Sequence, residues 1–139
     1  MMEGVLGLTY LGTLLYASIT DRKQLIVKDR VHIIIIILGI IQYQTVFGHL
    51  IGALVITIPF LVFAIKTDKL GGGDVKFIFA NTVLLGFKES YAGMLAGLTA
   101  LILVFYMKKV LRGIGSKRIA FVPFLSLGYM VVFLLIHLK

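Results

Sequence analysis

The chain has 139 residues, of which 60% are hydrophobic and 14% are charged, and it carries a formal net charge of +8. Together with a mean hydropathy of +1.06, this composition is untypical of a soluble domain and indicates a polytopic membrane protein. The sequence contains no cysteine, which excludes disulfides, thiolate metal ligands and a cysteine nucleophile.

Apolar segments along the chain predict an all-α fold with about six transmembrane helices. They lie at 4–20, 31–47, 48–65, 75–87, 89–107 and 119–138. The uncharged stretch 31–65 would be about 50 Å long as one helix, whereas a bilayer core is about 30 Å thick. This stretch must therefore turn, and we expect the turn around Gln42-Tyr43-Gln44 and Gly48-His49.

The basic residues predict how the spans are oriented. The fourth segment is short, since the part of it that is free of charge would form a helix of only about 16 Å. If it crosses, all 14 Lys and Arg residues except Lys88 and Lys139 lie on one side, as is typical of cytoplasmic loops. If it does not, the cluster at 108–118 moves to the outer side and the asymmetry largely vanishes. We therefore expect six crossings, both termini on the outer side, and one domain over residues 1–139.

Three other interpretations of these features have less support. The first apolar stretch, up to Ser18, is short enough for a signal peptide, but Glu3 stands where a positive charge would be expected. Nucleic-acid binding is not expected, because the basic residues lie between apolar spans instead of alternating with aromatics in a groove. His32, His49 and His137 are too dispersed for a convincing metal site, so we expect no metal and no cofactor.

Two of the few acidic residues stand at the ends of spans. Asp21 follows the first span, and Asp74 follows Gly71-Gly72-Gly73 and opens the fourth segment. The glycines permit positive φ angles and the close approach of another chain. Two aspartates on different helices can share one proton, so that one takes a proton from water while the other polarises a carbonyl group. We assign no fixed role to either, because such a pair titrates as a unit.

Three separated motifs have the order found in a known protein family. Gly71-Gly72-Gly73-Asp74-Val75-Lys76 is a glycine-rich run that ends in aspartate and is followed closely by lysine, Asp21 follows an apolar helix, and residues 119–128 hold Pro-Phe and then a glycine. These motifs resemble the type IV prepilin peptidases, which belong with the GxGD aspartyl proteases. Where that family has Ile-Pro-Asn after the first aspartate, this chain has Val27-Lys28-Asp29.

The resemblance implies an aspartic endopeptidase with Asp21 and Asp74 as its catalytic pair. Gly71, Gly72, Gly73 and Lys76 would form a substrate-binding active-site loop. The substrate would be a prepilin-like membrane protein, such as a pilin, pseudopilin or archaellin precursor, cut at the cytoplasmic face just before its hydrophobic helix. Larger relatives carry a cysteine-containing segment and methylate the new N-terminus, so we expect the short, peptidase-only form.

The sequence leaves several alternatives open. Asp21 and Asp74 could carry protons or bind cations in a small transporter or channel subunit, or the chain could be a noncatalytic assembly factor. Asp29 and Asp68 are expected to be capping or solvated loop residues. Gly93 and Gly97 form a G-x-x-x-G pattern that suits packing within the chain or a homodimer. The basic residues could also recruit anionic lipid in the bilayer.

Overall fold

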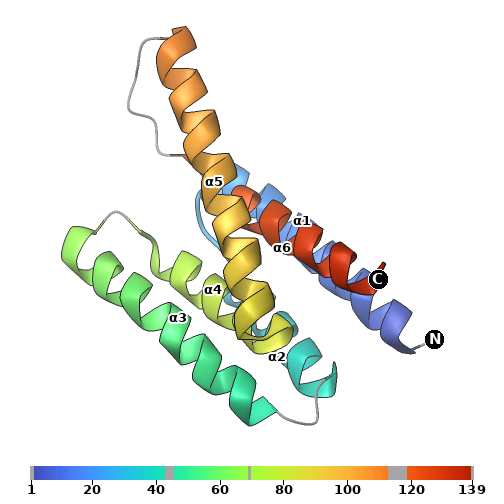
Figure 1. The fold of residues 1–139 in the computed structure, drawn as a ribbon. Helices are drawn as coiled ribbons and strands as arrows, with labels where there is room; N and C mark the ends of the chain where they lie inside the picture. Colours follow the sequence, from blue (N-terminus) through green and yellow to red (C-terminus); the bar gives the residue numbers. More distant parts are fainter. Residues whose placement is uncertain (1, 43–45, 69, 113–118, 139) are drawn as a thin grey trace.

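The structure is a computed structural model that describes residues 2–42, 46–68, 70–112 and 119–138. Within these ranges it is all-helical, as the sequence predicts (Figure 1). The helices are α1 (Met2–Gln24), α2 (Asp29–Gln42), α3 (Val46–Thr67), α4 (Gly72–Leu85), α5 (Phe87–Arg112) and α6 (Val122–His137). Each predicted apolar segment corresponds to one helix, with ends shifted by a few residues.

The predicted turn within 31–65 is placed between α2 and α3. Helix α2 ends at Gln42 and α3 begins at Val46, whereas Gly48 and His49 lie inside α3. The connecting residues 43–45, which include Tyr43 and Gln44 of the predicted turn, lie outside the described residues.

Helix α4, the shortest predicted span, is the centre of the fold. It packs against α2, α3, α5 and α6, and its residues from Ala80 to Leu85 are all buried. Polar side chains are accommodated there by hydrogen bonds: Asn81 accepts one from the Tyr10 hydroxyl at 2.6 Å, and Thr82 shares one with Ser90 at 2.7 Å. Its 14 residues make a helix of about 21 Å. Neighbouring helices cover α4, so its length need not match the bilayer.

Helices α5 and α6 approach closely through glycines. A Cβ atom on Gly97 would lie 2.7 Å from the carbonyl oxygen of Phe124, and one on Gly128 would collide with the carbonyl oxygen of Gly93. The Gly93 and Gly97 pattern therefore serves packing within the chain, and a homodimer stays a prediction. The last turns of α5 project beyond the other helices (Figure 1).

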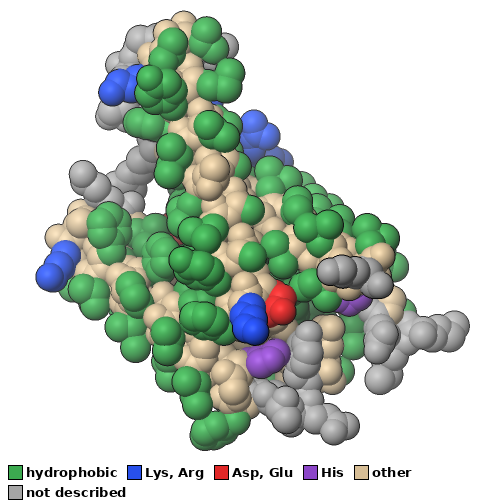
Figure 2. Space-filling model, in the orientation of Figure 1, with side chains coloured by type: hydrophobic (Ala, Val, Ile, Leu, Met, Phe, Trp, Pro, Cys, Tyr) green, Lys and Arg blue, Asp and Glu red, His purple; other side chains and the backbone are tan. Residues whose placement is uncertain are grey.

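The outer surface of the bundle is strongly apolar. Figure 2 shows hydrophobic side chains over most of the visible face, and side chains such as Ile58, Leu61 and Ile102 are exposed. Among the described residues, Phe47–Thr67 and Phe87–Leu111 are long and apolar enough to cross a membrane, and Val122–His137 is a shorter apolar helix. These features suit contact with lipid, whereas six crossings and the orientation of the termini stay predictions.

The helix ends gather into two groups at opposite ends of the bundle. The end of α1 contacts the start of α6, and the start of α2 contacts the start of α4. At the other end, Gly86 joins α4 to α5 with a φ of 87°, a conformation that favours glycine. His49 of α3 packs beside it, with Nδ1 3.1 Å from the carbonyl oxygen of Val83.

Candidate active site

Asp21 lies in the last turns of α1, just beyond the predicted first span, and is held by the start of α6. Only 4% of it is exposed, and its Oδ2 accepts a hydrogen bond of 3.1 Å from the backbone N–H of Val122. The first N–H groups of a helix have no partner within the helix, and their partial positive charge attracts a carboxylate. Burial raises the pKa of Asp21, while the N–H groups of Val122 and Phe121 act in the opposite direction.

Asp74 lies in the first turn of α4 and is half-buried. Its Oδ2 accepts a hydrogen bond of 3.2 Å from the N–H of Gly71, the residue that caps the helix. Burial and, secondly, the negative charge of Asp21 raise the pKa of Asp74 to about 6, and the Gly71 N–H opposes them. The structure thus brings both predicted aspartates to one end of the bundle, near enough for their charges to interact.

The glycine run is more regular than the sequence analysis expects. Gly71 is extended, with φ −70° and ψ 142°, and Gly72 and Gly73 already belong to α4. None of the three has a positive φ, and Gly72 and Gly73 lie in a helix where the sequence analysis expects a loop. A Cβ atom on Gly72 would meet nothing within 4 Å. The run therefore forms a helix start directly before Asp74, open at Gly72, whereas Gly73 lies against Val27.

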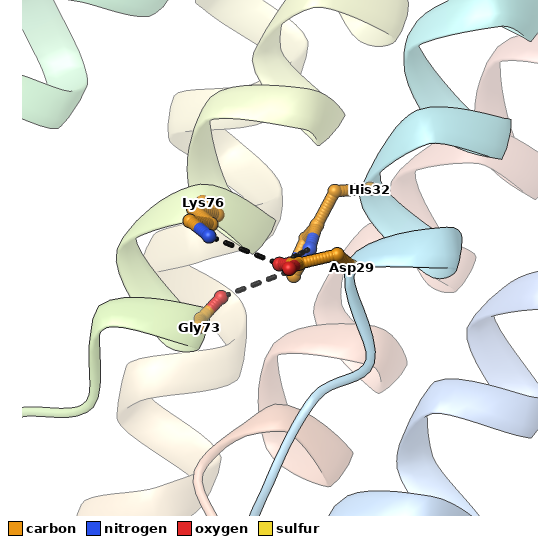
Figure 3. A network of polar contacts seen from close by, with 4 residues as sticks. All are labelled: Asp29, His32, Gly73 and Lys76. Atoms are coloured by element: carbon orange, nitrogen blue, oxygen red, sulfur yellow. Dashed lines mark hydrogen bonds and ion pairs between the residues drawn. The ribbon is translucent and has the colours of Figure 1, made fainter.

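A polar network joins α2 to the start of α4 (Figure 3). Lys76 Nζ donates to Asp29 Oδ1 at 2.9 Å, and this ammonium group holds the pKa of Asp29 below its ordinary value. His32, which is 5% exposed, places Nε2 3.1 Å from the carbonyl oxygen of Gly73. Lys76 lies one turn into α4, close to the glycine run, and its partner Asp29 is a residue expected to be a capping or solvated loop residue.

The sequence analysis missed His32 and Asp29 as neighbours of the glycine run. The spacing of these two residues in the sequence indicates that they lie together, because residues three apart are on the same face of a helix. This face begins where Val27-Lys28-Asp29 departs from the resembled family. Within the described parts of the chain, no three His, Asp or Glu side chains come together in a way that could hold a metal ion.

A known protein family matches most of the chain. The chain matches the type IV leader peptidase family over residues 8–136. Neither the curated proteins nor the solved structures that were compared with it give a match. The matched range extends from α1 to α6 and includes both aspartates and the start of α6. The chain therefore belongs to the type IV leader peptidase family, and its apolar helices suit a membrane-associated peptidase.

Proposed function

We propose that the protein is an aspartic endopeptidase with Asp21 and Asp74 as its catalytic pair. It removes the leader peptide of prepilin-like precursors at the cytoplasmic face of the membrane. The observation that carries the proposal is the interaction of two carboxylates from different helices at one end of an apolar bundle. Family membership supports leader peptides as the substrate class.

The two carboxyl groups act through a water molecule in the proposed reaction. The ionised carboxylate takes a proton from the water as its oxygen attacks the scissile carbonyl carbon, and the protonated carboxyl gives its proton to the carbonyl oxygen. When the resulting diol collapses, the carboxyl that took the proton from water gives it to the leaving amine, and the other carboxylate takes a proton from a diol hydroxyl, so that the pair again holds one proton. The pKa of Asp74, raised to about 6, supports a pair that retains one proton up to about that pH.

The glycine run and Lys76 form the substrate-binding part of the proposed site. The exposed backbone of Gly71 and Gly72, with open space at Gly72, lets an extended peptide approach Asp74 closely, and Gly73 completes this part of the site. Lys76 and Asp29 bring exposed charges beside it. In the proposed orientation, this end of a multi-pass bundle faces the cytoplasm, because the basic residues concentrate there.

Co-expression with a prepilin from the same genome tests this function. Leader removal is followed by gel shift and mass spectrometry for the wild type, Asp21→Asn and Asp74→Asn, with Asp68→Asn as a matched control on the same predicted side. We expect cleavage by the wild type and by the control, and none by the other two variants, which should still be inserted and folded. Cleavage by both Asp21→Asn and Asp74→Asn would refute the catalytic pair.

A further inference from the structure

A cleft of about 440 Å³ lies beside the candidate active site, between α2, α3 and α4. Helices α2 and α3 each pack along α4, but among the described residues they make little contact with one another. The cleft occupies the space between them. Its lining residues are Asp29, His32, Ile33, Ile36, Thr57, Val75, Lys76 and Phe79. The volume falls in the range of about 300–1,000 Å³ that ligand pockets occupy.

Two buried polar atoms of residues that line this cleft have no hydrogen-bond partner. They are the Oγ1 atom of Thr57 and the Nδ1 atom of His32, and these residues are only 9% and 5% exposed. Every other threonine among the described residues donates its hydroxyl to the carbonyl group four residues earlier. Leaving buried polar atoms unpaired is costly, so such atoms point to a bound partner.

The two unpaired atoms are complementary to a peptide group. The carbonyl oxygen of Gly73 can only accept, so Nε2 of His32 carries the proton in their 3.1 Å hydrogen bond. In a neutral ring, Nδ1 is then an acceptor. It lies 3.7 Å from Asp29 Oδ1, which is too far for a hydrogen bond. The Thr57 hydroxyl can donate, so the residues that line the cleft hold one unpaired acceptor and one unpaired donor, the two kinds of group that pair with a backbone N–H and C=O.

The other side chains that line the cleft determine which chemical groups can bind in it. Ile33, Ile36, Val75 and Phe79 are apolar, and the charges of Asp29 and Lys76 pair with each other where the helices start. The distance along α2 from Asp29 to Ile36 is about 10 Å, which is the length of about three extended residues. Val75 and Lys76, the two residues after Asp74, line the cleft, so one end of the cleft lies at the same end of α4 as Asp74.

We propose that this cleft binds the first apolar residues after the scissile bond of the substrate, with His32 Nδ1 and Thr57 Oγ1 pairing with their backbone. This assignment rests on the proposed function and names a subsite of the same reaction. The leader, before the scissile bond, lies outside the cleft. The apolar start of the substrate's hydrophobic segment is thereby placed between α2 and α3, and the bond before it lies at the aspartates.

Thr57→Val tests the hydroxyl, because valine has nearly the same shape and no polar atom. The loss of one hydrogen bond to substrate should lower kcat/KM for the prepilin by about three- to tenfold. Thr57→Ser should restore it. The melting temperature should not fall, since an unpaired buried hydroxyl is being removed. Thr99→Val, on the exposed face of α5, is the control and should leave kcat/KM unchanged. An unchanged kcat/KM in Thr57→Val would overturn the role of Thr57.

Photo-cross-linking tests where the substrate lies without needing turnover. p-Benzoylphenylalanine replaces Phe79 in the cleft or, as a control, exposed Phe105 of α5, each with Asp74→Asn and the intact precursor. We expect position 79, and not 105, to cross-link residues directly after the scissile bond. Cross-links to the leader, or none, with a precursor that the wild type cleaves would overturn the cleft assignment and leave the proposed function standing. A precursor that the wild type never cleaves would contradict both.

Discussion

The two aspartates at the site have different surroundings, although both have pKa values raised by burial. Asp21 receives the N–H groups that begin α6, whereas Asp74 receives one from Gly71 and also faces the charge of Asp21. Hydrogen bonds to a carboxylate favour its ionised form, and a like charge disfavours it. The asymmetry makes Asp74 the better holder of a shared proton in the resting protein.

The pH dependence of cleavage follows from this asymmetry. The pKa of Asp74 is raised from 3.8 to about 6, so the pair loses its proton as the pH rises through that value. We expect kcat/KM of the purified protein to fall above pH 6, approaching about tenfold per pH unit. Initial rates of leader removal between about pH 5 and 8 measure this. A rate that climbs steadily over that interval would contradict a pair that needs one proton.

The main residues of the candidate site could be identified from the sequence, but the side chains that pair with one another there could not. Asp21, Asp74 and the glycine run could be recognised because they stand at the ends of apolar segments. The pairing of Lys76 with Asp29 could not, because it joins residues 47 positions apart. Both side chains are well exposed, so no burial pattern in the sequence marks this pair.

The helices differ in how well the sequence defines them. The apolar segments predict all of them, because long uncharged runs have few other solutions in a membrane protein. The glycine run was misjudged because glycine permits a positive φ without requiring one. Gly72 and Gly73 belong to α4. The carboxylate of Asp74 accepts a hydrogen bond from the N–H of Gly71 at the start of that helix.

Packing of α6 on α5 should affect the site, since α6 begins at Val122, the partner of Asp21. Gly97→Ala would put a methyl group 2.7 Å from the Phe124 carbonyl oxygen and 2.9 Å from the Leu125 Cα. These are backbone atoms of α6, so the helices must separate, at a cost of about 1–3 kcal/mol. We expect a lower melting temperature in detergent and slower cleavage.

Gly12→Ala is the matched control for this change. It also lies in a helix, but its new Cβ would meet nothing within 4 Å. Alanine is favoured over glycine in a helix interior by roughly 0.5–1 kcal/mol, so this variant should melt at the same temperature or higher. Equal melting temperatures for Gly97→Ala and the wild type would mean that the close α5 and α6 contact is absent.

At the scale of the whole molecule, the bundle collects the starts of α2, α4 and α6 around the end of α1. The positive ends of the α6 and α4 helix dipoles therefore lie at the carboxylates of Asp21 and Asp74, respectively. The basic residues that determine the predicted orientation lie in the same connections. One end of the bundle thus combines the acidic pair with the charge pattern of a cytoplasmic face.

Cysteine labelling tests the predicted orientation, because the natural sequence has no cysteine to give background. In intact cells, a membrane-impermeant maleimide should label Lys88→Cys but not Lys109→Cys, both of which replace exposed side chains. After the membrane is permeabilised, both should react. Labelling of Lys109→Cys in intact cells would reverse the orientation and place the aspartates on the outer side.

The most direct test of the central claim is whether Asp21 and Asp74 act as one unit. Single-turnover rates of leader removal are compared for the wild type, Asp21→Asn, Asp74→Asn and the double variant, all purified and folded. Because residues that act together are non-additive, we expect each single substitution to abolish cleavage to the same background and the double variant to be no slower. Measurable single-variant rates whose losses multiply in the double variant would contradict a catalytic pair.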